Sequence, residues 1–454
     1  MAPLSGPRVA GPIPGPRSRE LLERQEQRES NARTYPRRLP IAIARAEGPF
    51  IEDLDGNVFL DFLTGAGVLA LGHNHPEVVE AVRRQLDVLC HGLDFPTEAK
   101  DEFVSVQLEL LPTEFRERAK VLFCGPAGAN AVDAALKLCK TATGRSEVIA
   151  FQGAFHGSTH SAMAVTGMVS QKEPVQNFMH GVHFFPYPNA YRSAVSPEGG
   201  PDWEACLHYF RSALEDPLGG ITRPAAVIME MVQAEGGVVP APTGFVRGVR
   251  EVTAELGIPL IVDEIQTGCG RTGTWFAFEQ HGIVPDVVLA SKAIGGIGMP
   301  VAVMFYDESL DVWSSGAHTG TFRGNQLAYV AGTAAARIIQ RDGILERVRE
   351  LGAHAFDVLQ GMQRENPAVG DVRGVGLMLG VEIVEPGTSE PDGEGARRVQ
   401  RAALENGLIV ELGGRHDAVV RLLPPLNIAR ETLDQALGIL ERAFSVALAE
   451  QLVA

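Results

Sequence analysis

The sequence predicts an α/β protein built on a mostly parallel central sheet. Between residues 76 and 335, short apolar runs alternate with longer segments of helical character. Uninterrupted apolar runs are typical of strands in a parallel sheet, because helices cover both faces of such a sheet. The candidate strands are 121–124, 147–151, 226–230, 259–263, 287–291 and 301–306, and the candidate helices are 129–141, 243–256 and 327–340.

The two ends of the chain predict a second, smaller α+β part. The N-terminal end offers a Pro- and Gly-rich arm at 1–17, a polar helix near 18–31 and a hairpin with a Gly56–Asn57 turn. The C-terminal end offers a long helix near 342–364, strands near 375–384, 408–412 and 419–423, and an amphipathic helix near 431–452. We expect residues 1–75 to form the arm and part of the small domain, 76–335 the large cofactor-binding domain, and 336–454 the C-terminal small domain.

Composition restricts the class of protein. Of the 454 residues, 45% are hydrophobic and 21% are charged, as is usual for a soluble globular protein. The formal net charge of −16 argues against nucleic acid or an anionic membrane as a partner. The five cysteines are scattered and odd in number, so we expect no disulfide framework. With no apolar stretch of transmembrane length and no apolar signal core, we expect a cytoplasmic protein.

Asp263 and Lys292 are the most informative pair of residues in the chain. Each closes an apolar run and leads into a glycine-containing turn. Strand ends of this kind are where α/β folds place their chemistry. A buried carboxylate and a buried lysine there suggest a pyridoxal phosphate site, in which the lysine holds the cofactor as a Schiff base. The carboxylate would keep the pyridine nitrogen protonated.

The other lysines support this interpretation of Lys292. Desolvation lowers the pKa of a lysine and favours the nucleophilic free amine. Taken by itself, Lys292 could instead be a strand-end lysine that extends into solvent. The chain has six lysines, and only the last lies between apolar strand residues and consecutive glycines: Lys100, Lys120, Lys137, Lys140, Lys172 and Lys292.

Two turns are candidates for binding a phosphate group. A strand, a small-residue turn and a helix follow one another over 122–133, so the N–H groups of Gly128 and Ala129 could close on a phosphate at the helix N-terminus. Thr321, in the turn 320–325, is a second candidate. The alternatives are a turn whose small residues serve packing, and an ordinary turn threonine.

Two further side chains could contact the cofactor ring. Phe155 follows the candidate strand 147–151, and its ring could stack on the pyridine face. Gln266 lies three residues beyond Asp263 and could donate a hydrogen bond to the phenolic oxygen. The alternatives are a core aromatic residue and a solvated turn glutamine.

These motifs together resemble the class III (ω-)aminotransferases of fold type I. The shared segments run through most of the chain and comprise residues 155–157, 230–236, 262–268, 291–292 and 320–322. The resemblance implies a pyridoxal phosphate enzyme that acts as a homodimer, with Thr321 reaching the phosphate of the neighbouring subunit. The cofactor-binding residues that it implies are Gly128, Ala129, Phe155, His156, Glu230, Asp263, Gln266, Lys292 and Thr321.

Within this class, the chain is most similar to the diaminobutyrate–2-oxoglutarate aminotransferases. The segments that carry this similarity are 29–36, 65–76, 123–126 and 318–325. Two residues depart from other members of the class. Ala127 stands where many members have a serine that contacts phosphate, and Ser158 stands where ornithine-type enzymes often have an arginine. The second departure weakens an ornithine assignment and leaves one substrate carboxylate contact unassigned.

The resemblance also implies how substrates are recognised. In the first half-reaction, the terminal amine of a diamino acid displaces Lys292 from the cofactor; in the second, 2-oxoglutarate takes up the amine and leaves as glutamate. Arg421 matches the family arginine that binds the α-carboxylate of 2-oxoglutarate, and Glu235 matches the residue that masks this arginine in the first half-reaction. Tyr35 is a candidate for binding the distal carboxylate of the diamino acid. The alternatives are a surface strand arginine at position 421 and a packing tyrosine of the N-terminal arm at position 35.

Other functions remain compatible with the sequence. One is another ω-amino acid aminotransferase, acting on ornithine, acetylornithine or 4-aminobutyrate. Another is an aminomutase, which would move an amine within one molecule and need no external keto acid. A third is a regulatory or scaffold protein that keeps the fold without catalysis, although the intact set of Lys292, Asp263 and Gln266 argues against it.

Overall fold

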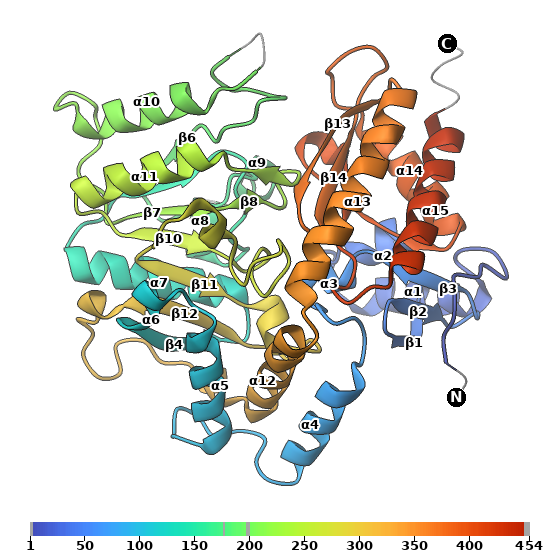
Figure 1. The fold of residues 1–454 in the computed structure, drawn as a ribbon, viewed down its shortest axis with the longest axis horizontal. Coiled ribbons are helices and arrows are strands. Elements are labelled where there is room, and N and C mark those ends of the chain that lie inside the picture. Colours follow the sequence, from blue (N-terminus) through green and yellow to red (C-terminus); the bar gives the residue numbers. More distant parts are fainter. Residues whose placement is uncertain (1–2, 176–177, 197–199, 449–454) are drawn as a thin grey trace. The chain divides into compact units, whose positions relative to one another are not determined.

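The chain forms two compact units, and both of its ends belong to the same one. A computed structural model describes residues 3–175, 178–196 and 200–448 (Figure 1). Unit 1 comprises Met1–Pro76 and Glu346–Ala454, and unit 2 comprises Glu77–Leu345. In the described part of the chain, no helix is both long enough and apolar enough to cross a membrane.

Unit 2 is built on a seven-stranded sheet in the order β4-β12-β11-β10-β7-β5-β6. Its strands are β4 (Ala119–Gly125), β5 (Val148–Phe151), β6 (Val182–Phe185), β7 (Ala226–Glu230), β10 (Leu260–Asp263), β11 (Val287–Ala290) and β12 (Ala302–Asp307). Strand β12 runs antiparallel to both neighbours, whereas β11, β10, β7, β5 and β6 pair in parallel. The mostly parallel α/β sheet predicted from the sequence is confirmed. A short hairpin, β8 (Val232–Gln233) and β9 (Val239–Pro240), follows β7.

The helices of unit 2 cover both faces of this sheet. They are α4 (Pro76–Leu86), α5 (Glu98–Glu109), α6 (Thr113–Arg116), α7 (Gly128–Thr143), α8 (His160–Val165), α9 (Val169–Lys172), α10 (Trp203–Glu215), α11 (Thr243–Glu255) and α12 (Gln326–Arg341). The 3₁₀ turns are η1 (Ala277–His281), η2 (Lys292–Gly295), η3 (Glu308–Leu310) and η4 (Thr321–Gly324).

The strands are apolar on both sides because each side meets a helix layer. Along β7, Val227 and Met229 belong to a core that includes residues of α5, α10, α11 and α12. The alternate residues, Ala226 and Ile228, belong to a second core that includes residues of α7 and α8. This arrangement explains the uninterrupted apolar runs in the sequence. Because helices cover both faces of the sheet, the strand ends are the part of the sheet that can line a functional pocket.

Unit 1 contains two four-stranded sheets, ordered β1-β2-β3-β15 and β13-β14-β17-β16. The strands are β1 (Ile43–Glu47), β2 (Phe50–Asp53), β3 (Val58–Asp61), β13 (Val369–Val375), β14 (Met378–Ile383), β15 (Leu408–Ile409), β16 (Glu411–Gly413) and β17 (Val419–Leu422). Strand β15 pairs in parallel with β3, Leu408 opposite Leu60, which joins the two ends of the chain. The helices are α1 (Pro16–Arg28), α2 (Tyr35–Arg38), α3 (Thr64–Gly67), α13 (Ile344–Glu365), α14 (Gly393–Glu405) and α15 (Arg430–Leu448), with the 3₁₀ turn η5 (Arg415–Asp417).

Unit 1 differs from the sequence prediction in two places. The expected strand at 408–412 is two strands that belong to different sheets, because the chain passes from one sheet to the other at Val410. The expected strand at 375–384 is the second half of a hairpin, β13–β14. Strand β13 escaped prediction because glycines and charged residues interrupt its apolar pattern. The last residues of the helix expected at 431–452 lie outside the described chain.

Candidate active site

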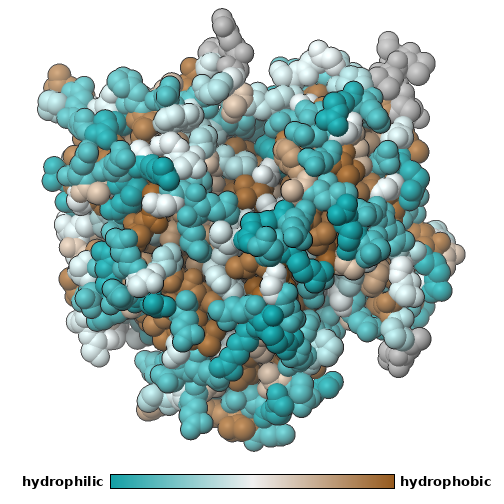
Figure 2. Space-filling view, viewed as in Figure 1, coloured by the Kyte–Doolittle hydropathy of each residue, from teal (hydrophilic) through white to brown (hydrophobic). Residues whose placement is uncertain are grey.

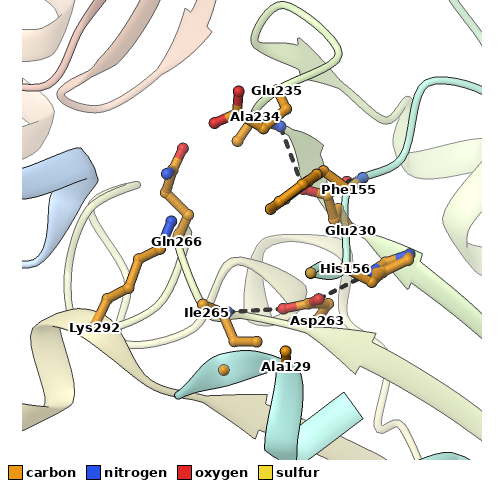
Figure 3. A pocket seen from close by; sticks show the side chains of 12 residues that line it. Ala129, Phe155, His156, Glu230, Ala234, Glu235, Asp263, Ile265, Gln266 and Lys292 are labelled. Carbon is orange, nitrogen blue, oxygen red and sulfur yellow. Dashed lines mark hydrogen bonds and ion pairs between the residues drawn. The ribbon is translucent and has the colours of Figure 1, made fainter. Parts of the chain in front are cut away.

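The strand ends of unit 2 line a partly open pocket of about 170 Å³ (Figure 3). Five segments of this edge contribute: the turns after β4, β5, β7, β10 and β11. Twelve residues line the pocket: Gly128, Ala129, Phe155, His156, Gly157, Glu230, Ala234, Glu235, Asp263, Ile265, Gln266 and Lys292. The carboxyl ends of parallel strands meet at one edge of a sheet, which brings together residues that are far apart in the sequence.

Lys292 enters the pocket from the turn that follows β11. Its backbone has a φ of 49°, a left-handed conformation that is costly for a residue with a side chain. The preceding Ser291 holds this turn, since its hydroxyl donates a 2.9 Å hydrogen bond to the carbonyl oxygen of Val301. Figure 3 shows the Lys292 side chain extending toward Gln266. Backbone strain that is fixed by neighbouring contacts is typical of functional residues.

Asp263 ends β10 and is oriented from two sides. One carboxylate oxygen, Oδ2, lies 2.8 Å from Nδ1 of His156, and the other, Oδ1, accepts a 3.0 Å hydrogen bond from the backbone N–H of Ile265. The side chain is buried, with 4% of the residue exposed. A carboxylate held in this way presents a fixed negative charge to a cationic nitrogen in the pocket.

His156 lies behind the carboxylate of Asp263 and contacts it. Burial alone would lower the pKa of His156, but the hydrogen bond and charge of Asp263, together with the charge of Glu230, raise it above its ordinary value. The backbone N–H of His156 donates to the hydroxyl of Thr166 at 2.9 Å. The imidazole therefore fixes the direction of the Asp263 carboxylate.

Glu230 ends β7 directly beside Asp263 in the parallel register. Its Oε2 accepts the backbone N–H of Phe155 at 3.0 Å, and its Oε1 accepts that of Ala234 at 3.3 Å. Burial raises the pKa of this carboxyl to about 7; nearby His156 opposes the shift and Asp263 adds to it. Glu230 thus ties the loop that carries Phe155 to the turn that carries Glu235.

The turn between β4 and α7 forms the floor of the pocket. Helix α7 begins at Gly128, and its N-cap is Ala127, whose N–H donates to the side chain of Asn130 at 3.2 Å. A Cβ atom on Gly128 would lie 2.8 Å from Cδ1 of Ile265, so glycine preserves the space between them. The first N–H groups of a 16-residue helix therefore face the pocket and suit a phosphate group.

Three predicted site residues lie outside this pocket. Thr321 belongs to unit 2 but is exposed in the turn η4, and it does not line the pocket of its own chain. Tyr35 and Arg421 belong to unit 1. There the Arg421 guanidinium lies 3.0 Å from the carboxylate of Glu411, and the Tyr35 hydroxyl donates to the same carboxylate at 3.1 Å.

Sequence reasoning missed several residues of the site. Ala234 and Ile265 line the pocket but carry no chemical signal in the sequence. Glu264 follows Asp263 and is equally buried, but it bonds the Thr267 hydroxyl and the Phe278 N–H instead of lining the pocket. Burial raises the pKa of this carboxyl to about 7. Strand alternation explains the difference, because adjacent side chains point to opposite sides.

Comparison with known proteins decides what kind of pocket this is. The sequence matches the aminotransferase class III family over residues 31–444. The chain is a class III aminotransferase. Pyridoxal phosphate is the cofactor of this family, and the residues of the pocket fit it: a helix N-terminus for phosphate, an oriented carboxylate, a lysine amine and the Phe155 ring.

Relatives of this class III aminotransferase cover nearly its whole length. It is 50% identical to the diaminobutyrate–2-oxoglutarate aminotransferase of Rhizobium meliloti, over 93% of this chain and 92% of the relative. It is 44% identical to the Haemophilus influenzae protein of the same name, over 92% and 93%. An amine transaminase structure from an uncultivated Pseudomonas species, in a form with pyridoxal phosphate bound, aligns with a TM-score of 0.83 at 27% identity, over 92% of this chain and 98% of that one.

Proposed function

We propose that this aminotransferase moves the terminal amine of L-2,4-diaminobutyrate to 2-oxoglutarate, giving an amino-acid semialdehyde and L-glutamate in two half-reactions. The observation that carries the proposal is the combination of a pocket whose residues fit the cofactor with relatives of 50% and 44% identity that bear this activity in their names. The assignment of the donor rests on those relatives, and the type of chemistry rests on the pocket.

Each residue of the pocket has its own role in the reaction. When bound, the cofactor supplies an electron sink for the carbon that carries the amine. Lys292 holds the cofactor at rest and, once displaced, moves a proton at that carbon. Asp263, oriented by His156, holds the pyridine nitrogen in its charged form. Gln266 and Phe155 line the pocket, where Gln266 would donate a hydrogen bond to the phenolic oxygen and Phe155 would stack on the ring.

Substrate selection requires that one arginine bind the acceptor without capturing the donor. Arg421 binds the α-carboxylate of 2-oxoglutarate in the second half-reaction, because a guanidinium pairs well with a carboxylate. Glu235 masks Arg421 in the first half-reaction, so that the diamino acid presents its terminal amine. Tyr35 contributes to binding the distal carboxylate of the donor.

A panel of amines tests this assignment. Each of diaminobutyrate, ornithine, lysine, 4-aminobutyrate and β-alanine is incubated with 2-oxoglutarate, and the glutamate formed is measured. We expect diaminobutyrate to give the highest kcat/KM. Higher activity with another donor would redirect the assignment, and consumption of donor without glutamate would favour an aminomutase. In the same assay, Glu235→Ala should form product from the α-amine; unchanged regiochemistry would contradict the gate.

We also propose that the enzyme works as a homodimer. Thr321 lies on an exposed face of unit 2, where its carbonyl oxygen is 2.7 Å from Nε2 of His91. Figure 2 shows that apolar side chains reach the molecular surface among hydrophilic ones. On unit 2, exposed apolar side chains lie in the segment that carries His91 and next to Thr321, where the Phe322 ring contacts the His91 ring. This group, the 86–95 surface, comprises Leu86, Val88, Leu89, Leu93, Phe95 and Phe322. An apolar group of this kind is typical of an interface, and a second copy would bring Thr321 to the neighbouring pocket.

A charged variant of the 86–95 surface should separate the subunits. Val88 and Phe95 are 77% and 68% exposed, so Val88→Asp with Phe95→Asp should leave the fold of each subunit intact. Burying two carboxylates at an interface is costly, and we expect a monomer with at least roughly tenfold lower activity. Sedimentation velocity measures whether the variant is a monomer or a dimer. Leu218→Asp, at a residue that is 90% exposed elsewhere on unit 2, is the matched control. If the double variant sediments like the wild type, this surface is not the interface.

A further inference from the structure

Arg421 is held by a carboxylate within its own unit. Strands β16 and β17 pair antiparallel with Glu411 directly opposite Arg421. The Arg421 Nη2 atom lies 3.0 Å from Oε2 of Glu411. Both residues are buried, since Arg421 is 1% exposed and Glu411 is 8% exposed. Low exposure makes such a pair electrostatically strong, because little water screens it.

The surrounding residues are arranged for this pair. The Tyr35 hydroxyl donates to the second oxygen of Glu411, Oε1, at 3.1 Å. The backbone carbonyl oxygen of Leu412 lies 3.4 Å from Nη2 of Arg421. A Cβ atom on Gly413 would lie 2.7 Å from Nε of Arg421, so a glycine is needed beside the guanidinium. The pair is therefore built into the hairpin and does not result from two flexible side chains meeting at a surface.

Stability alone does not account for a buried ion pair. Removing two charges from water costs about as much as the pair regains, and apolar residues of similar volume would often stabilise the hairpin equally well. A carboxylate next to Arg421 is useful for another reason, because the two substrates of the proposed reaction differ in charge. Diaminobutyrate carries two ammonium groups and one carboxylate near neutral pH, whereas 2-oxoglutarate carries two carboxylates.

We propose that Glu411 is a specificity-determining positioning residue that balances the charge of Arg421, so that one arginine can serve both half-reactions. The inference rests on the proposed role of Arg421 in binding the acceptor. With Glu411 ionised, the pair is neutral and does not repel the cationic donor. The carboxylate of 2-oxoglutarate then competes with Glu411 for the guanidinium. Glu411 thereby weakens acceptor binding and favours donor binding.

The variant Glu411→Gln tests this proposal, because it removes the charge and keeps an oxygen that can accept from Tyr35. We expect the KM for 2-oxoglutarate to fall and the KM for diaminobutyrate to rise, each on the order of tenfold, because Glu411 no longer balances the charge of Arg421. Calorimetry should show tighter binding of glutarate, which has both carboxylates and no keto group to react. The opposite directions of the two KM changes are the signature of a charge effect.

Unit 1 provides a matched control in the same sheet. Arg373 of β13 and the buried Glu382 of β14 form another cross-strand pair, with Nη1 2.6 Å from Oε2, and the same Nη1 lies 2.8 Å from Oδ2 of Asp371. Glu382→Gln should lower the midpoint of thermal unfolding and leave both KM values unchanged. If Glu411→Gln behaves like this control, or if both of its KM values rise, Glu411 is a structural partner only and the proposal is overturned. If Glu411→Gln does not fold, Glu411→Asp retracts the carboxylate by one methylene and should move both KM values in the same directions by less.

Arg421→Lys separates this inference from the proposed function. If that variant binds 2-oxoglutarate and glutarate as well as the wild type does, Arg421 is not the acceptor residue and the proposed function of this residue fails. If Arg421→Lys weakens both ligands but Glu411→Gln leaves their binding unchanged, the role of Arg421 stands and the inference about Glu411 fails.

Discussion

Replacing Lys292 with alanine should abolish amine transfer. The side chain performs two tasks, holding the cofactor and moving a proton at the reacting carbon, and a positioned acid–base group contributes roughly 10²–10⁴-fold by itself. We therefore expect kcat to fall by at least about 10³-fold. Glutamate formation measures the activity, and borohydride reduction followed by peptide mapping tests the covalent bond directly. In the wild type, the reduced cofactor should be recovered on the peptide that contains Lys292.

Lys140 provides the control for a general effect of losing a lysine. It lies on α7, in the same unit, and burial lowers its pKa from the ordinary value. Lys140→Ala should retain nearly full activity, because this lysine does not line the pocket. Recovery of the Lys292 peptide unmodified from fully loaded, freshly reduced wild-type protein would contradict the assignment, as would appreciable activity of Lys292→Ala.

Replacing Asp263 with asparagine should have the second largest effect. Asparagine keeps the shape of the side chain and one acceptor oxygen but loses the charge that holds the pyridine nitrogen protonated. Removing a single preorganised electrostatic partner costs about 10²–10³-fold in rate, so we expect kcat to fall by at least that factor. Both half-reactions should slow, since both draw electrons into the same ring, and single-turnover measurements of each would show it.

The adjacent Glu264 is a closely matched control for Asp263. Both are buried carboxyls of one turn, but Glu264 bonds Thr267 and Phe278 and does not line the pocket. Glu264→Gln should change stability more than rate. The pKa of Glu264 is raised to about 7 in the folded protein, so folding takes up a proton at pH values between its ordinary pKa and about 7. Within this pH range, the contribution of this carboxyl makes the fold less stable as the pH rises. Equal losses of rate in Asp263→Asn and Glu264→Gln would show that the charge of Asp263 has no special role.

The sequence predicted unit 2 better than unit 1 for a physical reason. Strands buried on both faces leave uninterrupted apolar runs, so β7, β10 and β11 were located to within one residue of their observed ends. The ends of two of these runs then identified Asp263 and Lys292, whereas Glu230 followed from the family resemblance. In unit 1, glycine and charge interrupt the pattern of β13, and β15 and β16 are only two and three residues long, so that periodicity alone could not separate β15 from β16.

The partners of the predicted residues could not be found in the same way. His156 and Asp263 are 107 positions apart, and Tyr35 and Glu411 are 376 apart, so local patterns contain no information on either contact. Glu411 in particular stands in a short strand with no motif around it. Its relation to Arg421 follows from the antiparallel register of β16 and β17, which only the folded chain shows.

The parallel pairing of β3 with β15 has a consequence for synthesis of the protein. The first strand of this pair leaves the ribosome almost 350 residues before its partner, since Leu60 pairs with Leu408. All of Glu77–Leu345 is translated in between and forms a unit of its own. Strand β3 therefore has no β15 to pair with until translation is nearly complete. A nascent chain in this state exposes an open strand edge, which is the kind of surface that chaperones protect.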